Sequence, residues 1–236
     1  MITGLSGLAD GLRVSLLVDD RWKLYLAGVK NTLILAAAAC LIGIVIGVFV
    51  AIIKYYSDEN AKQGRKNIVL QILSAICNIY TTVIRGTPII IQMLILYSLA
   101  FKGGFETCIV AFGINSGAYI SEIIRSGLMS IDYGQTEAGR SLGLSKTATM
   151  RFIILPQAVK NILPALFNEF IALLKETSVA GYIAVRDLTK AADGIKGRTL
   201  RTEPLFVAAA IYLVLVIGLT KLQQNFERRL SHSDRN

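Results

Sequence analysis

The stretch EAGRSLGLSKTATMRFIILP, Glu137–Pro156, separates two long apolar blocks of the chain and differs in character from both. It carries one acidic and three basic side chains, a group of small residues, and an apolar run that a proline follows. The charges make it too polar for a lipid-facing helix, and its ordered pattern is not that of an irregular loop. We therefore expect a folded polar insert between two membrane-spanning segments.

Local signals predict that this insert contains two short helices within about residues 132–160. Asp132 is a suitable N-cap, with Gln135 as its partner at N3, for a first helix that runs through about Leu142. Gly143 tolerates a positive φ, so it is expected to end the first helix and to turn the chain.

The second helix of the insert is expected to begin at the cap Ser145 and to run until Pro156. On the first helix, Ala138 and Gly139 are expected to expose backbone. A surface helix with so few large apolar side chains gains little from its own packing, so it fits a partner's groove, where small residues allow close approach. An ordinary hairpin between two spans is the simpler alternative, and the residues alone leave it open.

The composition of the whole chain indicates an all-α integral membrane protein. Of its 236 residues, 53% are hydrophobic and 17% are charged, whereas about a quarter of the residues of a soluble domain are charged. The apolar residues form five blocks, each long enough to cross about 30 Å of hydrocarbon as a helix. We expect a single transmembrane domain over residues 1–236, with spans at about 24–53, 68–101, 107–128, 164–185 and 204–222.

Two of these blocks carry signals for helix packing and bending. Gly43 and Gly47 stand four residues apart in the first block, a spacing that lets two helices approach closely. The sequence RGTP, Arg85–Pro88, interrupts the second block. Its proline predicts a break or kink within a helix that can still span the membrane as one unit.

Several kinds of site are disfavoured by the residue types present. His232 is the only histidine and lies in a polar tail, which argues against His-based triads, His-rich metal sites and HExxH chemistry. Cys40, Cys77 and Cys108 lie in apolar stretches without CxxC or zinc-like spacing, so we expect core side chains and neither metal nor cofactor. The net charge of +9 suits basic faces beside membrane lipid. Nucleic-acid binding is not expected, because no basic stripe is interleaved with aromatic residues.

The insert resembles the signature of the inner-membrane permease subunits of ABC importers, EAA-x3-G-x9-I-x-LP. The matching positions, with glycine as the third small residue, are Glu137, Ala138, Gly139, Gly143, Ile153, Leu155 and Pro156. Three further stretches, RGTP followed by IIIQ, GINSGAYISEIIRSG and NEFIALLKETSV, resemble the polar amino-acid uptake branch of that family. The link LAFKGGFETCIVAFG is several residues shorter than expected for the family, which leaves the docking contacts of that outer loop open.

This resemblance implies that the insert forms two coupling helices that seat in a groove of a cytoplasmic ATPase. The N-terminus is then outside and the C-terminus cytoplasmic, in the inner or plasma membrane of a prokaryote. The distribution of Lys and Arg agrees weakly with this orientation, since these residues are in slight excess on the side of the insert. The chain has no GxxxxGK[ST] phosphate loop, so it is not expected to be an enzyme, and ATP hydrolysis is assigned to a partner.

The resemblance also implies a function and a set of partners. The function is import of polar amino acids, and the partners are an ABC ATPase dimer, a second permease subunit, identical or homologous, and an extracytoplasmic amino-acid-binding protein. One alternative is an ion-driven secondary transporter, although no internal repeats are evident. Others are an ABC permease for another small solute and a membrane enzyme that uses Glu122 or Glu169 as acid or base.

Polar side chains within the apolar blocks are candidates for the substrate path, because a charge that faces lipid costs at least about 2.5 kcal/mol. Asn115, Tyr119 and Glu122 lie at i, i+4 and i+7, on one face of the third helix. An amino acid needs carboxylates for its amine and hydrogen-bond donors for its carboxylate. The candidates are Arg85, Asn115, Tyr119, Glu122, Asn168, Glu169, Thr177 and Ser178. The alternative is a structural role, with Arg85 near a helix end and Lys175 paired with Glu169 or Glu176.

Overall fold

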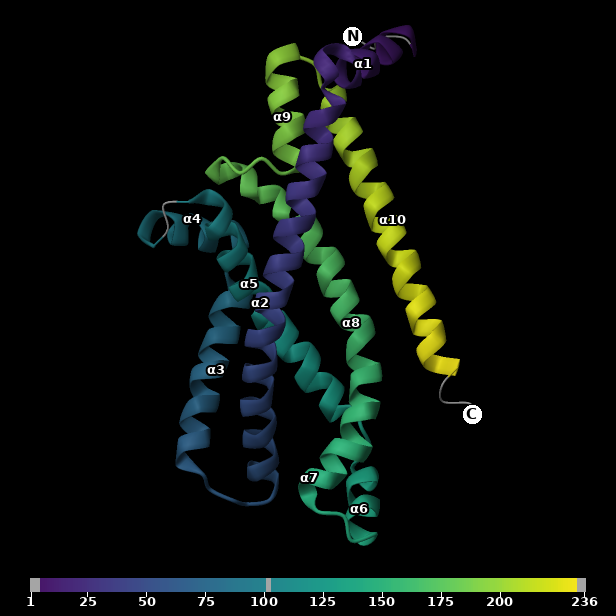
Figure 1. Ribbon diagram of the computed structural model, residues 1–236. Helices are drawn as coiled ribbons and strands as arrows, with labels where there is room; N and C mark the ends of the chain where they lie inside the picture. The colour runs from purple at the N-terminus through teal and green to yellow at the C-terminus, as the bar shows by residue number, and fades with distance from the viewer. Residues whose placement is uncertain (1–4, 101–102, 233–236) are drawn as a thin grey trace.

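The computed structural model describes residues 5–100 and 103–232, and within them the chain is almost entirely helical (Figure 1). Here η1 and η3 are 3-10 helices and η2 is a π-helix. In chain order the elements are α1 (Leu5–Leu16), η1 (Val18–Asp20), α2 (Trp22–Lys62), α3 (Ile68–Gly86), α4 (Ile89–Leu99), α5 (Gly104–Met129), α6 (Tyr133–Ser141), α7 (Lys146–Thr149), η2 (Met150–Ile154), α8 (Leu155–Glu176), η3 (Thr177–Ile183), α9 (Leu188–Thr199) and α10 (Glu203–His232).

Five helical runs in the described part of the chain are long and apolar enough to cross a membrane. Each contains most of one of the apolar blocks, so the expected all-α membrane fold with five spans is confirmed. The runs are Val18–Lys62, Ile68–Gly86, Gly104–Met129, Lys146–Ile183 and Glu203–Arg229.

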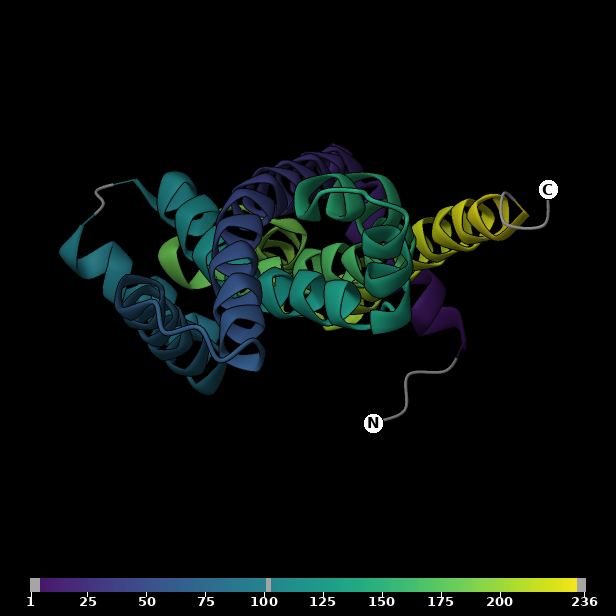
Figure 2. The same ribbon diagram turned by 90° about the horizontal axis from the view of Figure 1, so that it is seen from below.

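The third span, α5, lies at the centre of the bundle. Figures 1 and 2 show α3 and α10 at opposite edges, with α2, α5 and α8 between them. Within the most apolar window of each span, 67% of α5 is buried, against 17% of α3 and 6% of α10. The two ends of the bundle also differ, because α6 and α7 lie at one end and α1 and α9 at the other. We call these the insert end and the α9 end.

Glycines on both helices bring α2 and α5 close together. A Cβ atom on Gly47 would lie 2.5 Å from Cγ2 of Ile120, and one on Gly117 would lie 2.9 Å from Cγ2 of Ile46. The glycine spacing in the first block was predicted to allow close helix packing, and the structure shows that packing. A second pair of glycines, on α5, faces the pair on α2. The two pairs are Gly43 and Gly47 on α2, and Gly113 and Gly117 on α5.

The first span is longer than the sequence predicts. α2 has 41 residues, which corresponds to about 60 Å of helix, roughly twice the hydrocarbon thickness of a bilayer. The helix continues through residues 54–62, which the sequence analysis leaves outside the membrane. This last part of α2 projects toward the insert end (Figure 1).

The second apolar block, expected as one span at 68–101, is divided into two helices. α3 ends at Gly86 and α4 begins at Ile89, while Thr87 and Pro88 are extended. The break has a local cause, because proline disfavours the helical conformation of the preceding residue and has no N–H to donate. The span is thus α3 alone, and α4 is turned away from it (Figure 1).

The prediction that Pro156 ends the second helix of the insert is wrong. One helical run continues from Lys146 to Ile183, through α7, η2, α8 and η3. Pro156 is the second residue of α8, and η2 immediately precedes that helix. A π-helix adjusts the backbone hydrogen bonding there, so a residue without a donor is accommodated. The insert is consequently continuous with the fourth span.

The segment between the predicted spans at 164–185 and 204–222 forms α9. Asp187 is fully buried and caps this helix. Its carboxylate accepts hydrogen bonds of 2.9 Å from the backbone N–H groups of Thr189 and Lys190, and one of 3.2 Å from the Tyr212 hydroxyl. Asp187 thereby ties α9 to α10.

Candidate functional site

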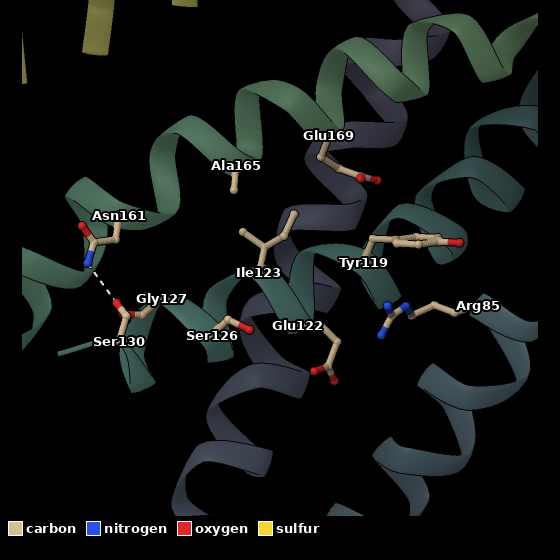
Figure 3. Close-up of a pocket in the computed structure, with 10 residues that line it drawn as sticks. All are labelled: Arg85, Tyr119, Glu122, Ile123, Ser126, Gly127, Ser130, Asn161, Ala165 and Glu169. Carbon is tan, nitrogen blue, oxygen red and sulfur yellow. Dashed lines mark hydrogen bonds between the residues drawn. The ribbon is translucent and has the colours of Figure 1, made fainter. Parts of the chain in front are cut away.

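An open cavity of about 520 Å³ lies between α3, α5 and α8 (Figure 3). Four of the eight side chains predicted to line a substrate path meet there: Arg85, Tyr119, Glu122 and Glu169. The other lining residues are Ile123, Ser126, Gly127, Ser130, Asn161 and Ala165. Ser130 and Asn161 are joined by a hydrogen bond of 2.9 Å at the insert end of the cavity.

One wall of the cavity presents a cation held against an aromatic ring. The guanidinium of Arg85, in the last turn of α3, lies 5.2 Å from the centre of the Tyr119 ring. Figure 3 shows the two side chains in contact from different helices. An exposed cation–π contact of this kind contributes about 0.5–1 kcal/mol, and it leaves the N–H groups of the guanidinium available for an anionic ligand.

The opposite wall presents the carboxyl of Glu169 from α8. One of its oxygens accepts a hydrogen bond of 3.1 Å from the hydroxyl of Ser116 on α5. Figure 3 shows this carboxyl on the other side of Tyr119 from Arg85. The cavity therefore offers a cation and a carboxyl on separate helices.

Glu122, in contrast, already has charged partners. It forms ion pairs with Lys54 of α2 and, at 3.1 Å, with Arg125 one turn further along α5. Arg125 also pairs with Asp58 of α2 at 3.2 Å, so the four residues balance one another in charge. Lys54 is only 8% exposed, and such a buried cation would be costly without its partner.

Lys54 and Arg125 were not predicted as partners of Glu122. The i, i+3 spacing of Glu122 and Arg125 is a signal that was available. Lys54 lies just beyond the predicted span at 24–53, and the continuation of α2 to Lys62 brings it to face α5.

The remaining four candidates lie elsewhere. Asn115 is buried and donates a hydrogen bond of 3.1 Å to Gln92 on α4. Thr177 is fully buried, and its hydroxyl donates to the backbone oxygen of Leu174 at 2.8 Å. Ser178 lines a different cavity, beside α9, and Asn168 is exposed and outside the cavity lining. These positions are not brought together with Arg85 and Glu169.

The predicted turn and N-caps of the insert are present, whereas Gln135, predicted as the reciprocal partner of Asp132, contacts it through the backbone, donating its N–H to the Asp132 carbonyl oxygen at 3.0 Å. Asp132 accepts a hydrogen bond from the N–H of Gly134 at the start of α6, and Ser145 accepts one of 3.1 Å from the N–H of Ala148. Between the two helices Gly143 has a φ of +82° and is exposed. The local pattern therefore predicts this turn correctly.

The expectation that Gly139 exposes backbone is wrong. Ala138 is exposed, but Gly139 is buried against the helix that follows. A Cβ atom on Gly139 would lie 2.8 Å from side-chain carbons of both Thr149 and Ile153. The small residue thus lets α6 pack on η2, a contact within the insert that the motif by itself does not reveal.

Large apolar side chains are exposed on the insert. Leu142, beside the turn, is 82% exposed, and Tyr133 and Phe152 are 64% and 66% exposed. Glu137 and Pro156 are also exposed, and Leu155 is 44% exposed. Such a group of exposed apolar residues among polar ones is typical of a surface that contacts another protein.

Five membrane-length helices, a cavity with charged side chains between three of them and an insert at one end are the architecture of a membrane transport subunit. The chain belongs to the family described as binding-protein-dependent transport system inner membrane component, which matches residues 68–232. This membership confirms the resemblance to permease subunits of ABC importers.

Similar proteins support the same assignment. A putative glutamine transport system permease protein, GlnP, of Rickettsia typhi is 36% identical over 86% of this chain and 91% of its own length. The arginine transport system permease protein ArtQ of Bacillus subtilis is 36% identical over 89% of this chain and 93% of its own length. A solved structure, described as an amino acid ABC transporter with histidines, has a TM-score of 0.80 and 37% identity, covering 97% of this chain and 100% of that one. The MetNI methionine ABC transporter, at 19% identity and a TM-score of 0.77, shares the fold.

Proposed function

We propose that this chain is the membrane-spanning permease subunit of an ATP-driven importer of polar amino acids. It pairs with a second permease subunit, sits on a cytoplasmic dimer of ABC ATPases and receives substrate from an extracytoplasmic binding protein. The membrane is the inner membrane of a prokaryote, with the N-terminus outside and the insert and C-terminus in the cytoplasm. The observation that carries the proposal is the folded insert, whose exposed apolar side chains suit a groove on another protein.

The cavity between the spans supports an amino acid as the substrate. Arg85 presents a guanidinium, which is suited to a carboxylate, and Glu169 presents a carboxyl, which is suited to an ammonium group. Glu122 contributes less than its sequence position predicts, because Lys54 and Arg125 already neutralise it. The relatives are named for glutamine, arginine and cystine transport, so the proposal extends to polar amino acids as a class.

The continuity of the insert with the fourth span supports a mechanical route from ATP to the cavity. ATP hydrolysis by the partner moves the insert, and the helical run Lys146–Ile183 carries that displacement to Glu169. Movement of α8 relative to α5 then opens the cavity alternately to either side of the membrane. The chain's own residues bind and orient the substrate, and the partner supplies the energy.

The test is Gly143→Leu in permease reconstituted into vesicles with its ATPase and binding protein. A side chain at this positive φ costs about 1–2 kcal/mol and redirects the turn that bears Leu142, so ATP-driven uptake is expected to be abolished while the variant still inserts into the membrane. Gly64→Leu is the matched control, because Gly64 also has a positive φ (+66°), open surroundings and a place outside the insert.

The control variant is expected to keep wild-type uptake. Unchanged uptake by the Gly143 variant contradicts the coupling role of the insert. If uptake by the wild-type protein is driven by an ion gradient and does not depend on ATP, secondary transport is supported instead.

A further inference from the structure

A second cavity, of about 480 Å³, separates the projecting end of α2 from the insert. Tyr55, Asp58, Glu59 and Lys62 line it from α2, and its other wall comes from the end of α5, the start of α6 and Ile154 of η2. The insert packs mainly on itself and on α8. A direct link between the insert and α2 is therefore expected beside this cleft.

Lys146, the first residue of α7, makes such a link. Its ammonium nitrogen lies 3.0 Å from Oε1 of Glu59 and 5.9 Å from the centre of the Tyr56 ring. The side chain of Glu59 is only 16% exposed, and its Oε2 is buried without a hydrogen bond within the described residues. The amide of Gln63 donates to Oε1 at 3.1 Å but carries no charge. Lys146 thus supplies the counter-charge of a largely buried carboxylate.

This arrangement resists separation of the insert from α2. The ion pair is partly exposed, because the Lys146 side chain is 47% exposed and that of Glu59 is 16% exposed, so we expect it to contribute up to about 1 kcal/mol. If the insert moved alone, Glu59 would lose its ion pair with Lys146. It is therefore favourable for α2 and the insert to move together.

The residue next to Glu59 continues the link toward the transport cavity. Asp58 pairs with Arg125 at 3.2 Å, and Arg125 pairs with Glu122 in the cavity wall. Adjacent residues of an α-helix point about 100° apart, so this helix end can hold α5 with one carboxylate and the insert with the next. The ion pair Lys146–Glu59 is thus joined, through the adjacent residue Asp58, to the ion pairs of Arg125 with Asp58 and Glu122.

We propose that the end of α2 acts as an ionic bracket, by which we mean the ion pairs of Glu59 with Lys146 and of Asp58 with Arg125. Through these pairs a displacement of the insert reaches the α5 wall of the transport cavity. The inference rests on the proposed function of the insert as the contact with the ATPase. Lys146 and Glu59 are positioning residues, because they touch neither ATP nor substrate. The bracket acts alongside the continuous helix of the fourth span, so that α5 and α8 both follow the insert.

The first experiment is a charge exchange in the reconstituted complex, with uptake and ATP hydrolysis measured on the same vesicles. Lys146→Glu and Glu59→Lys are each expected to lower the uptake per ATP hydrolysed by about fivefold, the upper range for a partly exposed ion pair. The double variant, which restores opposite charges, is expected to recover most of that ratio. Lys66→Glu, at an exposed lysine in the α2–α3 connector, is the control for charge alone and is expected to match wild type.

A merely structural role predicts a different result, namely less protein in the membrane with an unchanged ratio of uptake to hydrolysis. That result overturns the proposal, and so does a double variant no better than the single ones. ATP-driven uptake by the wild-type complex is measured first. If the wild-type complex shows no ATP-driven uptake, the proposed function is contradicted. If the wild-type complex takes up substrate and the single variants have the same uptake per ATP hydrolysed, only the bracket is contradicted.

The second experiment replaces the ion pair by a covalent link. Glu59→Cys and Lys146→Cys are combined in a chain whose native cysteines, Cys40, Cys77 and Cys108, are replaced by alanine. Joining the new pair with a short reducible thiol cross-linker is expected to raise uptake per ATP above that of the unlinked pair, and reduction is expected to reverse the gain. Loss of uptake on cross-linking shows that the two parts must separate, which overturns the bracket.

Discussion

The close contact of α2 and α5 predicts that a single methyl group at Gly47 destabilises the protein. The added Cβ would lie 2.5 Å from Cγ2 and 2.9 Å from Cβ of Ile120, and 3.1 Å from the backbone nitrogen of Ser121. Two of these atoms belong to the backbone or to the stiff base of a β-branched side chain, so they cannot rotate away. The helices have to move apart.

The expected magnitude follows from two opposing effects. Overpacking costs about 1–3 kcal/mol, and replacing a helical glycine by alanine returns about 0.5–1 kcal/mol. Gly47→Ala is therefore expected to lose about 1–2 kcal/mol net. Gly218→Ala is the matched control, because Gly218 lies within α10 and has nothing within 4 Å of its Cβ position. That variant is expected to be neutral or slightly stabilised.

The assay is thermal unfolding of the two purified variants in the same detergent. A difference of about 2 kcal/mol between them corresponds to about 4–8 °C for a chain of this size. The helix that moves, α5, carries Tyr119 and Glu122, so uptake by the Gly47 variant is expected to fall as well. Equal unfolding temperatures for the two alanine variants would refute the close α2–α5 contact.

Three further substitutions test other parts of the structure. Gly139→Val is expected to push α6 off Thr149 and to abolish ATP-driven uptake, with membrane insertion preserved; normal uptake would contradict the internal packing of the insert. Asp187→Ala removes the cap of α9 and is expected to lower stability by about 1–2 kcal/mol, measured by thermal unfolding against Asp187→Asn, which keeps a capping oxygen. Glu169→Gln is expected to raise the KM for uptake severalfold, whereas the neighbouring Asn168→Ala is expected to leave the KM unchanged. Equal effects of the two substitutions on the KM would contradict a role of Glu169 in substrate binding.

Part of the substrate cavity could be predicted from the sequence. Tyr119 and Glu122 share a helix face by their spacing, and that face does line the cavity. Thr177 was predicted as a candidate together with Glu169, but the Thr177 hydroxyl donates to the backbone oxygen of Leu174, one turn earlier in the same helical run. Helical spacing indicates which residues share a face, and only packing determines which face meets the cavity.

What the sequence by itself determines here is local. Hydrophobic length defines the five spans, and Asp132, Gly143 and Ser145 define the insert, since caps and positive φ depend on a few neighbouring residues. The tertiary structure decides what depends on distant contacts. Gly139 packs against the helix that follows it, Lys54 neutralises Glu122, and Lys146 pairs with Glu59 of α2, because the packing of separate helices brings these residues together.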